Sequence, residues 1–293
     1  MGRATENGPE WSGRRVEVRL IAVDLDGTVL RANGAISRRT RRALAAARRR
    51  GIVVSVATGR SPAGAQLYER LLGANGPLIC LDGALVFAGG AVLLDRPMDP
   101  SSVREVARIT EQLGGGWVAL TKRGRVHGGP SRRPPQARFG RVLRQPLTSY
   151  RFWRSIRLED ARWGGDISGE AVHKLLLWTP PGPARQNLDQ ALRAMPLHVP
   201  SSPGSTVEVV APGVSKGVAL ALVAEHLHIP REQIVAFGDG RNDAEMLSYA
   251  GRGVAMGGAA PEALAAADAS TDGVQHDGLA REVYRLLGVR HRP

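Results

Sequence analysis

Two pairs of acidic residues follow apolar runs in this sequence of 293 residues. Asp24 and Asp26 come directly after VRLIAV, and Asp239 and Asp243 come after IVAFG. Carboxylates held close together repel one another unless a cation or a proton offsets their charge. Oxygen ligands favour Mg2+, which takes a few carboxylates and keeps water and phosphate oxygens as its other ligands. Because no His or Cys stands near these residues in the sequence, the pattern argues against zinc.

A hydroxyl and an ammonium are candidates for the phosphate side of the same site. Thr58 and Gly59 end the apolar run IVVSVA just before a predicted helix, where backbone N–H groups favour an anion. Lys216 opens another predicted helix and is one of three lysines among 40 basic residues. A compact ammonium suits a crowded phosphoryl site better than a broad guanidinium does. Taken alone, a residue of either kind is more often a helix cap or a surface charge. The segment Asp24 to Gly27, taken alone, is also explained by a turn with two solvated acids.

The elements that must position these side chains alternate between apolar strands and amphipathic helices. We predict strands at 18–23, 52–57 and 77–87, and a helix that begins after the N-cap Ser37 and ends at Gly51. Strand, helix and strand in this order predict a parallel sheet with right-handed crossovers. Ligands bind at the carboxyl ends of such strands, so the acidic loops should lie side by side there.

The α/β pattern is interrupted in the middle of the chain and returns at Ser215. We therefore expect an α/β protein with a Rossmann-like parallel-sheet core and an inserted α/β (α+β) cap domain. The predicted parts are a flexible tail at 1–17, a core at 18–97 and 204–293, and a cap at 98–203.

Composition limits the class of protein. No apolar run is long enough for a membrane span or a signal peptide, so we expect a cytoplasmic protein with no membrane partner. The net charge is +13, and most of the excess positive charge lies at 121–163, which contains twelve basic and two acidic residues. We interpret this stretch as a solvated face and expect no nucleic-acid partner. The one cysteine, Cys80, excludes an intrachain disulfide.

The motifs VDLDGT, ATGR, SKG and GDGRND, in this order, resemble those of the haloacid dehalogenase (HAD) superfamily. The long insertion resembles that of the Cof-type sugar-phosphate phosphatase branch, which has a type IIB cap. The short motifs ML, AG, VAMG and DGV in the last part of the chain are also similar to this branch. The likeness covers residues 19–285. It implies a phosphatase whose substrate is a small phosphorylated metabolite: a sugar phosphate, a nucleotide or a phosphorylated cofactor.

The resemblance also implies a role for each motif residue. Asp24 would attack phosphorus and form an aspartyl-phosphate, and Asp26 would protonate the leaving oxygen and then activate water. The phosphoryl group would be held or oriented by Thr58, Lys216 and Asn242. Mg2+ would be bound by the Asp24 carboxylate, the Asp26 carbonyl and Asp239, with Asp243 direct or through water.

One residue departs from the pattern of this branch. Asp82 stands where Asn is usual, before Gly-Ala, and an added carboxylate would weaken phosphate binding unless it is protonated, paired with an Arg or turned to a sugar hydroxyl. The substrate is therefore less defined than the fold. For Lys216 we expect that its replacement costs turnover far more than folding. Its ammonium, beside Mg2+ and the positive end of its own helix, is unfavourable until phosphate arrives, although the four carboxylates partly offset this.

Two alternatives to a general metabolite phosphatase remain. A phosphomutase, or a phosphatase of one committed pathway, would share the chemistry up to the aspartyl-phosphate. A polyanion-binding protein with a vestigial site would use the basic insertion, although all four motifs keep competent residues. The sequence is compatible with a monomer or a homodimer.

Overall fold

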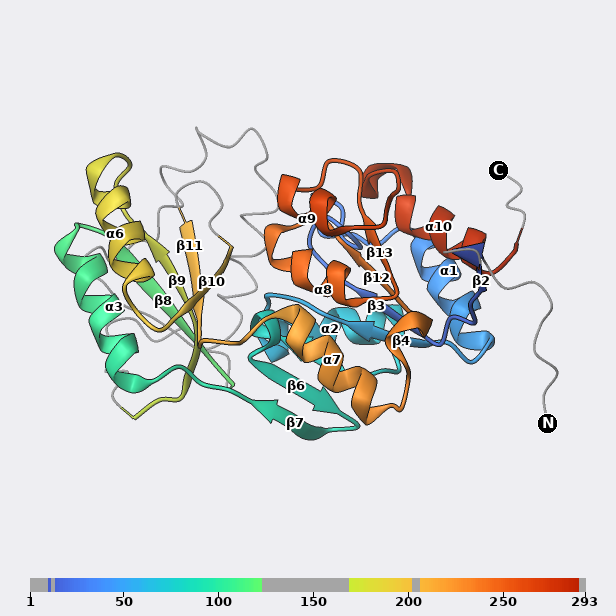
Figure 1. The fold of residues 1–293 in the computed structure, drawn as a ribbon, viewed down its shortest axis with the longest axis horizontal. Coiled ribbons are helices and arrows are strands. Elements are labelled where there is room, and N and C mark those ends of the chain that lie inside the picture. The colour runs from blue at the N-terminus through green and yellow to red at the C-terminus, as the bar shows by residue number, and fades with distance from the viewer. Residues whose placement is uncertain (1–9, 12–13, 123–168, 202–205, 290–293) are drawn as a thin grey trace. The chain divides into compact units, whose positions relative to one another are not determined.

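The chain forms two compact units (Figure 1), each described here by itself. The computed structural model describes residues 10–11, 14–122, 169–201 and 206–289. The first unit comprises Met1–Thr58, Tyr68–Leu78 and Lys216–Pro293, and the second comprises Gly59–Leu67 and Ile79–Ser215. These bounds differ from the predicted core and cap at 59–67, 79–97 and 204–215, and the predicted domain limits stay a prediction.

A five-stranded parallel sheet forms the core of the first unit, in the order β14-β13-β12-β3-β4. Its strands are β3 (Leu20–Val23), β4 (Val53–Val56), β12 (Ile234–Gly238), β13 (Arg252–Ala255) and β14 (Ala269–Ser270). Every residue of β3 and β12 is buried. Helices cover both faces of the sheet, which explains why these strands are uninterrupted apolar runs.

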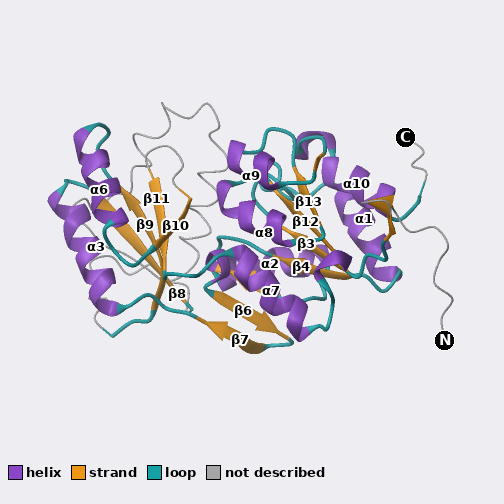
Figure 2. Ribbon diagram, in the orientation of Figure 1, coloured by secondary structure: helices purple, strands orange, loops and turns teal. Residues whose placement is uncertain are grey.

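Two groups of helices pack beside this sheet (Figure 2). One group contains α1 (Arg38–Arg49) and α10 (Gly278–Leu286), and the other contains α7 (Lys216–His226), α8 (Ala244–Tyr249) and α9 (Pro261–Ala266). Helix α2 spans Pro62–Leu72. The Ser37 side chain accepts a hydrogen bond from the Thr40 N–H, which confirms the predicted N-cap of α1. Short 3-10 turns lie at Leu81–Gly83 (η1), Arg231–Gln233 (η2), Arg241–Asp243 (η3) and Val274–His276 (η4).

The second unit contains an antiparallel sheet of order β10-β11-β9-β8. Its strands are β8 (Gly116–Thr121), β9 (Val172–Trp178), β10 (His198–Ser201) and β11 (Thr206–Val210). Helix α3 (Pro100–Gln112) packs on β8, β9 and α6 (Pro183–Arg193). The parallel and antiparallel sheets together confirm the α/β core with a separate α+β part.

The predicted strand at 77–87 is wrong as a single element of the parallel sheet. It is divided into β5 (Leu78–Cys80), η1 and β6 (Leu85–Ala88), and it pairs with β7 (Ala91–Asp95) in a three-stranded sheet. The cause is the backbone of η1, where Leu81, Asp82 and Gly83 have φ angles of 51, 56 and 100°. Left-handed residues cannot continue an extended strand.

Two further predictions concern the ends and the insertion. Within the predicted tail, β1 (Glu10–Trp11) pairs with β2 (Arg14–Arg15). Of the basic stretch at 121–163, only Thr121 and Lys122 belong to the described residues. In the described part of the chain, no helix has the length and apolar character needed to cross a membrane.

Candidate active site

Two neighbouring strands deliver the acidic residues to one edge of the parallel sheet. Asp24 follows β3 and Asp239 follows β12, and the two strands pair with Val23 opposite Phe237. The Asp24 N–H donates to the Phe237 carbonyl at 3.0 Å, which holds the two loops side by side. The structure therefore brings together the loops that the sequence places at the ends of separate strands.

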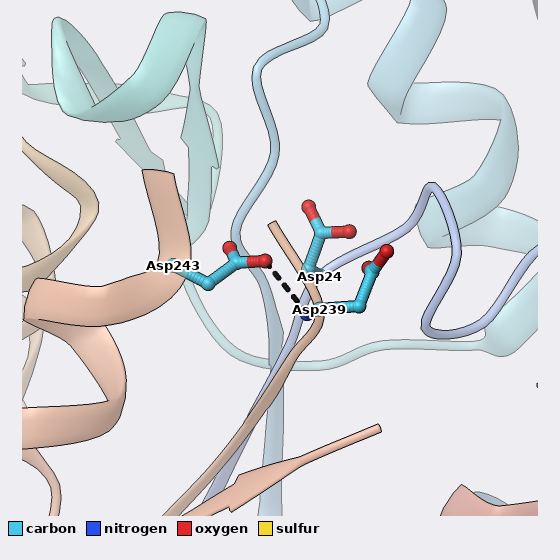
Figure 3. A group of neighbouring side chains, drawn as sticks. All are labelled: Asp24, Asp239 and Asp243. Carbon is cyan, nitrogen blue, oxygen red and sulfur yellow. Dashed lines mark hydrogen bonds between the residues drawn. The ribbon is translucent and has the colours of Figure 1, made fainter. Parts of the chain in front are cut away.

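Three carboxylates converge at this edge (Figure 3). Asp24, Asp239 and Asp243 each offer one oxygen, and these oxygens lie within 4.8 Å of one another. Asp24 and Asp243 are buried and Asp239 is half-buried. A compact set of carboxylate oxygens is the donor chemistry that a hard divalent cation prefers. The residues present therefore fit Mg2+.

Lys216 is joined to this group by two ion pairs. Its Nζ lies 2.7 Å from Asp24 Oδ1 and 2.6 Å from Asp243 Oδ1, and its side chain is 1% exposed. Lys216 is the first residue of α7, and the chain returns to the first unit at this residue. Two carboxylates already hold the ammonium in the protein alone. Replacement of Lys216 should therefore cost stability as well as turnover, contrary to the expectation from the sequence.

Asp243 also fixes the loop that carries Asp239. Its Oδ2 accepts hydrogen bonds from the N–H groups of Asp239 at 2.9 Å and Gly240 at 2.8 Å. Its other oxygen accepts from Lys216. One carboxylate thus sets the course of the loop after β12 and the position of the ammonium.

The electrostatics of the group favour protons or a cation. Burial raises the pKa of Asp24 well above its usual range, against the opposing effect of Lys216, and the neighbouring carboxylates raise it further. Burial and then Asp243 raise the pKa of Asp239 to about 7, although a hydrogen bond from Thr28 lowers it. That hydrogen bond joins Thr28 Oγ1 to Asp239 Oδ1 at 2.9 Å. Near neutral pH, a cation would compete with protons for this site.

The other predicted residues lie around the group. Thr58 is fully buried after β4, which pairs with β3, so it stands at the same sheet edge as Asp24. Asp26 is half-buried in the turn after β3 and is not one of the three convergent carboxylates. Asn242 is half-buried in η3, with its Oδ1 against Gly240. The roles assigned to these residues stay predictions.

Sequence reasoning missed a second buried charge cluster, which lies within the second unit. Lys174 Nζ is 2.5 Å from Asp82 Oδ2, 3.1 Å from Glu208 Oε1 and 3.3 Å from the carbonyl oxygen of Gly59. Asp82, the residue that departs from the family pattern, is thus paired with a lysine. The rarity of lysine in this chain was the signal that could have identified Lys174.

A parallel sheet with acidic loops at its carboxyl edge, a motif lysine and a separate α+β unit define the class of protein. A model of the haloacid dehalogenase-like hydrolases matches residues 21–283. The chain belongs to this family, as one of its Cof-type members, and the enzyme is a phosphatase. The resemblance seen in the motifs is confirmed.

Two curated relatives and one solved structure illustrate the similarity. The chain is 27% identical over 271 residues to the 5-amino-6-(5-phospho-D-ribitylamino)uracil phosphatase YitU of Bacillus subtilis, covering 89% of this chain and 95% of the relative. It is 29% identical over 248 residues to the HMP-PP phosphatase of Cronobacter sakazakii, covering 84% and 87%. The structure of the HAD subclass IIB sugar phosphatase BT4131 superposes with a TM-score of 0.76 at 22% identity, covering 93% of this chain and 100% of that one.

Proposed function

We propose that this protein is a Mg2+-dependent phosphatase that hydrolyses phosphate monoesters of small metabolites through an aspartyl-phosphate on Asp24. The observation that carries the proposal is the group of three carboxylates, with Lys216 Nζ 2.7 Å from Asp24 Oδ1. This arrangement would supply a nucleophile, a cation site and a compact positive charge at one sheet edge. Phosphoryl transfer needs these three parts.

The chain's own residues would carry the reaction in two steps. In the first, Asp24 attacks phosphorus, the P–O bond to the leaving group breaks, and Asp26 gives its proton to the leaving oxygen. In the second, Asp26 takes a proton from water as that water attacks phosphorus and releases Asp24. Splitting one displacement into two lowers the barrier of each.

Charge on the transferring group would be met by Lys216 and by Thr58, with backbone N–H groups at Gly59. Asn242 would orient the group. Mg2+ would be held by Asp24 and Asp239, by the Asp26 carbonyl, and by Asp243 directly or through water. When bound, it would neutralise charge on the phosphoryl oxygens.

The substrate class follows from the relatives. One relative is named as a phosphatase of 5-amino-6-(5-phospho-D-ribitylamino)uracil and another as a phosphatase of HMP-PP. These names support a substrate among sugar phosphates, nucleotides and phosphorylated cofactors. A phosphomutase or a pathway-specific phosphatase remains the alternative, because it would use the same first step.

A substrate screen tests the proposal. Purified protein is assayed for phosphate release from these three classes, with Mg2+ and with EDTA, beside the variants Asp24→Asn and Asp189→Asn. Asp189 lies on α6 and pairs with Arg185, so its variant is a control for a lost surface carboxylate. We expect metal-dependent release that only Asp24→Asn abolishes. Release that persists in EDTA or in Asp24→Asn would contradict the proposal.

A further inference from the structure

We propose that Lys174 is a positioning residue that fixes the loop at Thr58–Arg60: its ammonium donates to the Gly59 carbonyl while it pairs with the buried carboxylate of Asp82 and the half-buried carboxylate of Glu208. The inference rests on the proposed function, in which this loop binds phosphate. All of the contacts that carry it lie within the second unit, to which Gly59 belongs.

The ammonium of Lys174 is fully used inside the protein. An ammonium has three N–H donors, and Lys174 has three acceptors, at 2.5 Å (Asp82), 3.1 Å (Glu208) and 3.3 Å (Gly59). Its side chain is 1% exposed. With no donor left for a substrate, Lys174 can act only through the groups that it holds.

The backbone at Asp82 is held in a conformation that needs support. Leu81 and Asp82 both have positive φ angles, a state that residues other than Gly keep only when their surroundings enforce it. The ion pair to Lys174 supplies one constraint. The Leu81 N–H supplies another, because it donates to the Arg60 carbonyl at 3.0 Å. The turn at η1 and the loop at Thr58–Arg60 are thus joined at two points.

Gly59 shows how closely this loop approaches the ion pair. A Cβ at position 59 would lie 2.9 Å from Asp82 Oδ1 and 3.0 Å from Lys174 Nζ. No side chain fits there without displacing the pair. Glycine at this position therefore leaves the ion pair undisturbed, in addition to any contact with phosphate.

The charge balance explains why a carboxylate is tolerated at position 82. Burial alone would lower the pKa of Lys174, but Asp82 and Glu208 outweigh it and the pKa is raised. The ammonium therefore stays charged and neutralises Asp82. A charged pair holds the loop more firmly than the neutral amide of the usual Asn would.

The test compares three variants. Lys174→Met alone would take away the ammonium that pairs with the buried Asp82 carboxylate and endanger folding, so the test variant is the double substitution Asp82→Asn with Lys174→Met. Asp82→Asn alone keeps the ammonium and its bond to Gly59. Lys122→Met is the control, since Lys122 is an exposed lysine that pairs with Asp95 at 3.0 Å.

Two measurements are made on protein shown to be folded by its melting curve. Hydrogen exchange follows the amides of 58–61, and kinetics with an aryl phosphate give kcat, KM and the inhibition constant of inorganic phosphate. We expect the double variant to exchange these amides faster and to bind inorganic phosphate about 10- to 100-fold more weakly. Asp82→Asn should change far less, and Lys122→Met should match the wild type.

The outcomes separate this inference from the proposed function. Unchanged exchange and unchanged inhibition by phosphate in the double variant, with an active wild type, would overturn the role of Lys174 alone. A loss of melting temperature with normal phosphate inhibition would make Lys174 a purely structural residue and would also overturn it. A wild type without Mg2+-dependent hydrolysis would refute the proposed function and, with it, the phosphate-binding role of the loop.

Discussion

Binding of Mg2+ should become tighter as pH rises through neutrality, because the cation and protons compete for the same carboxylates. The pKa of Asp239 is raised to about 7 by burial and by Asp243. If binding requires ionised Asp239, the apparent Kd is the intrinsic Kd multiplied by one plus the ratio of protonated to ionised Asp239. With this pKa, affinity should rise about tenfold between about pH 6 and pH 8, with ~0.9 proton released at the lower pH and ~0.1 at the higher. Asp24, whose pKa is also raised, can only add to this change.

The raised pKa of Asp239 also determines how the stability of the metal-free protein changes with pH. Because the pKa of folded Asp239 is raised, the folded state keeps a proton that the unfolded chain releases. Its contribution to the free energy of unfolding is present in acid and is lost as pH rises through about 7. Mg2+ should therefore raise the melting temperature more at pH 8 than at pH 6.

Isothermal titration calorimetry with Mg2+, in two buffers of different ionisation enthalpy, measures both affinity and proton release. Asp239→Asn should remove the part of the proton release that comes from Asp239 and should weaken binding. Thr28→Val removes the 2.9 Å hydrogen bond that lowers the Asp239 pKa, so it should move the midpoint of the pH dependence upward. An affinity that is the same at pH 6 and pH 8, with no proton released, would refute the assignment of Asp239 to the cation.

Two substitutions test the geometry around this group. Lys216→Met leaves Asp24 and Asp243 without their shared ammonium, so the metal-free variant should lose about 3–5 kcal/mol of stability. Its turnover should fall about 10²–10³-fold. Thermal melting and steady-state kinetics measure the two effects, and an unchanged melting temperature would contradict the prediction. Gly27 has a φ of +87°, and in Gly27→Ala the added Cβ would clash with the Asp239 carboxylate. The Mg2+ affinity measured by calorimetry should therefore drop. An affinity equal to that of the wild type would show that Gly27 does not set the position of Asp239.

Much of the core could be predicted because its signals are local. The strands at Leu20–Val23 and Ile234–Gly238 are short continuous apolar runs that are followed by acidic residues, a composition typical of strands buried on both faces. Parallel pairing then brings their ends together without further information. Ser37 was likewise predictable, because an N-cap depends on a residue and its next turn.

The features that could not be predicted depend on contacts between distant residues. Nothing in the sequence near Lys216 shows that Asp24 and Asp243 hold its ammonium, since the first ion pair joins residues 192 positions apart. The turn at Leu81–Gly83 looks like part of an apolar strand, because Leu81 gives no local sign of a positive φ. Its conformation is tied to Lys174, which is 92 positions from Asp82.

The central claim is that Asp24 becomes phosphorylated, and a burst experiment on Asp26→Asn tests it most directly. An aryl phosphate has a good leaving group, so formation of the aspartyl-phosphate needs little help from Asp26, whereas its hydrolysis needs Asp26 to activate water. With 4-nitrophenyl phosphate and Mg2+ in a stopped-flow instrument, we predict a rapid release of nitrophenol that approaches one equivalent per chain, followed by slow turnover. The double variant Asp24→Asn with Asp26→Asn should show no burst. Linear release without a burst in Asp26→Asn at the wild-type rate, or a burst that survives the loss of Asp24, would contradict Asp24 as the nucleophile.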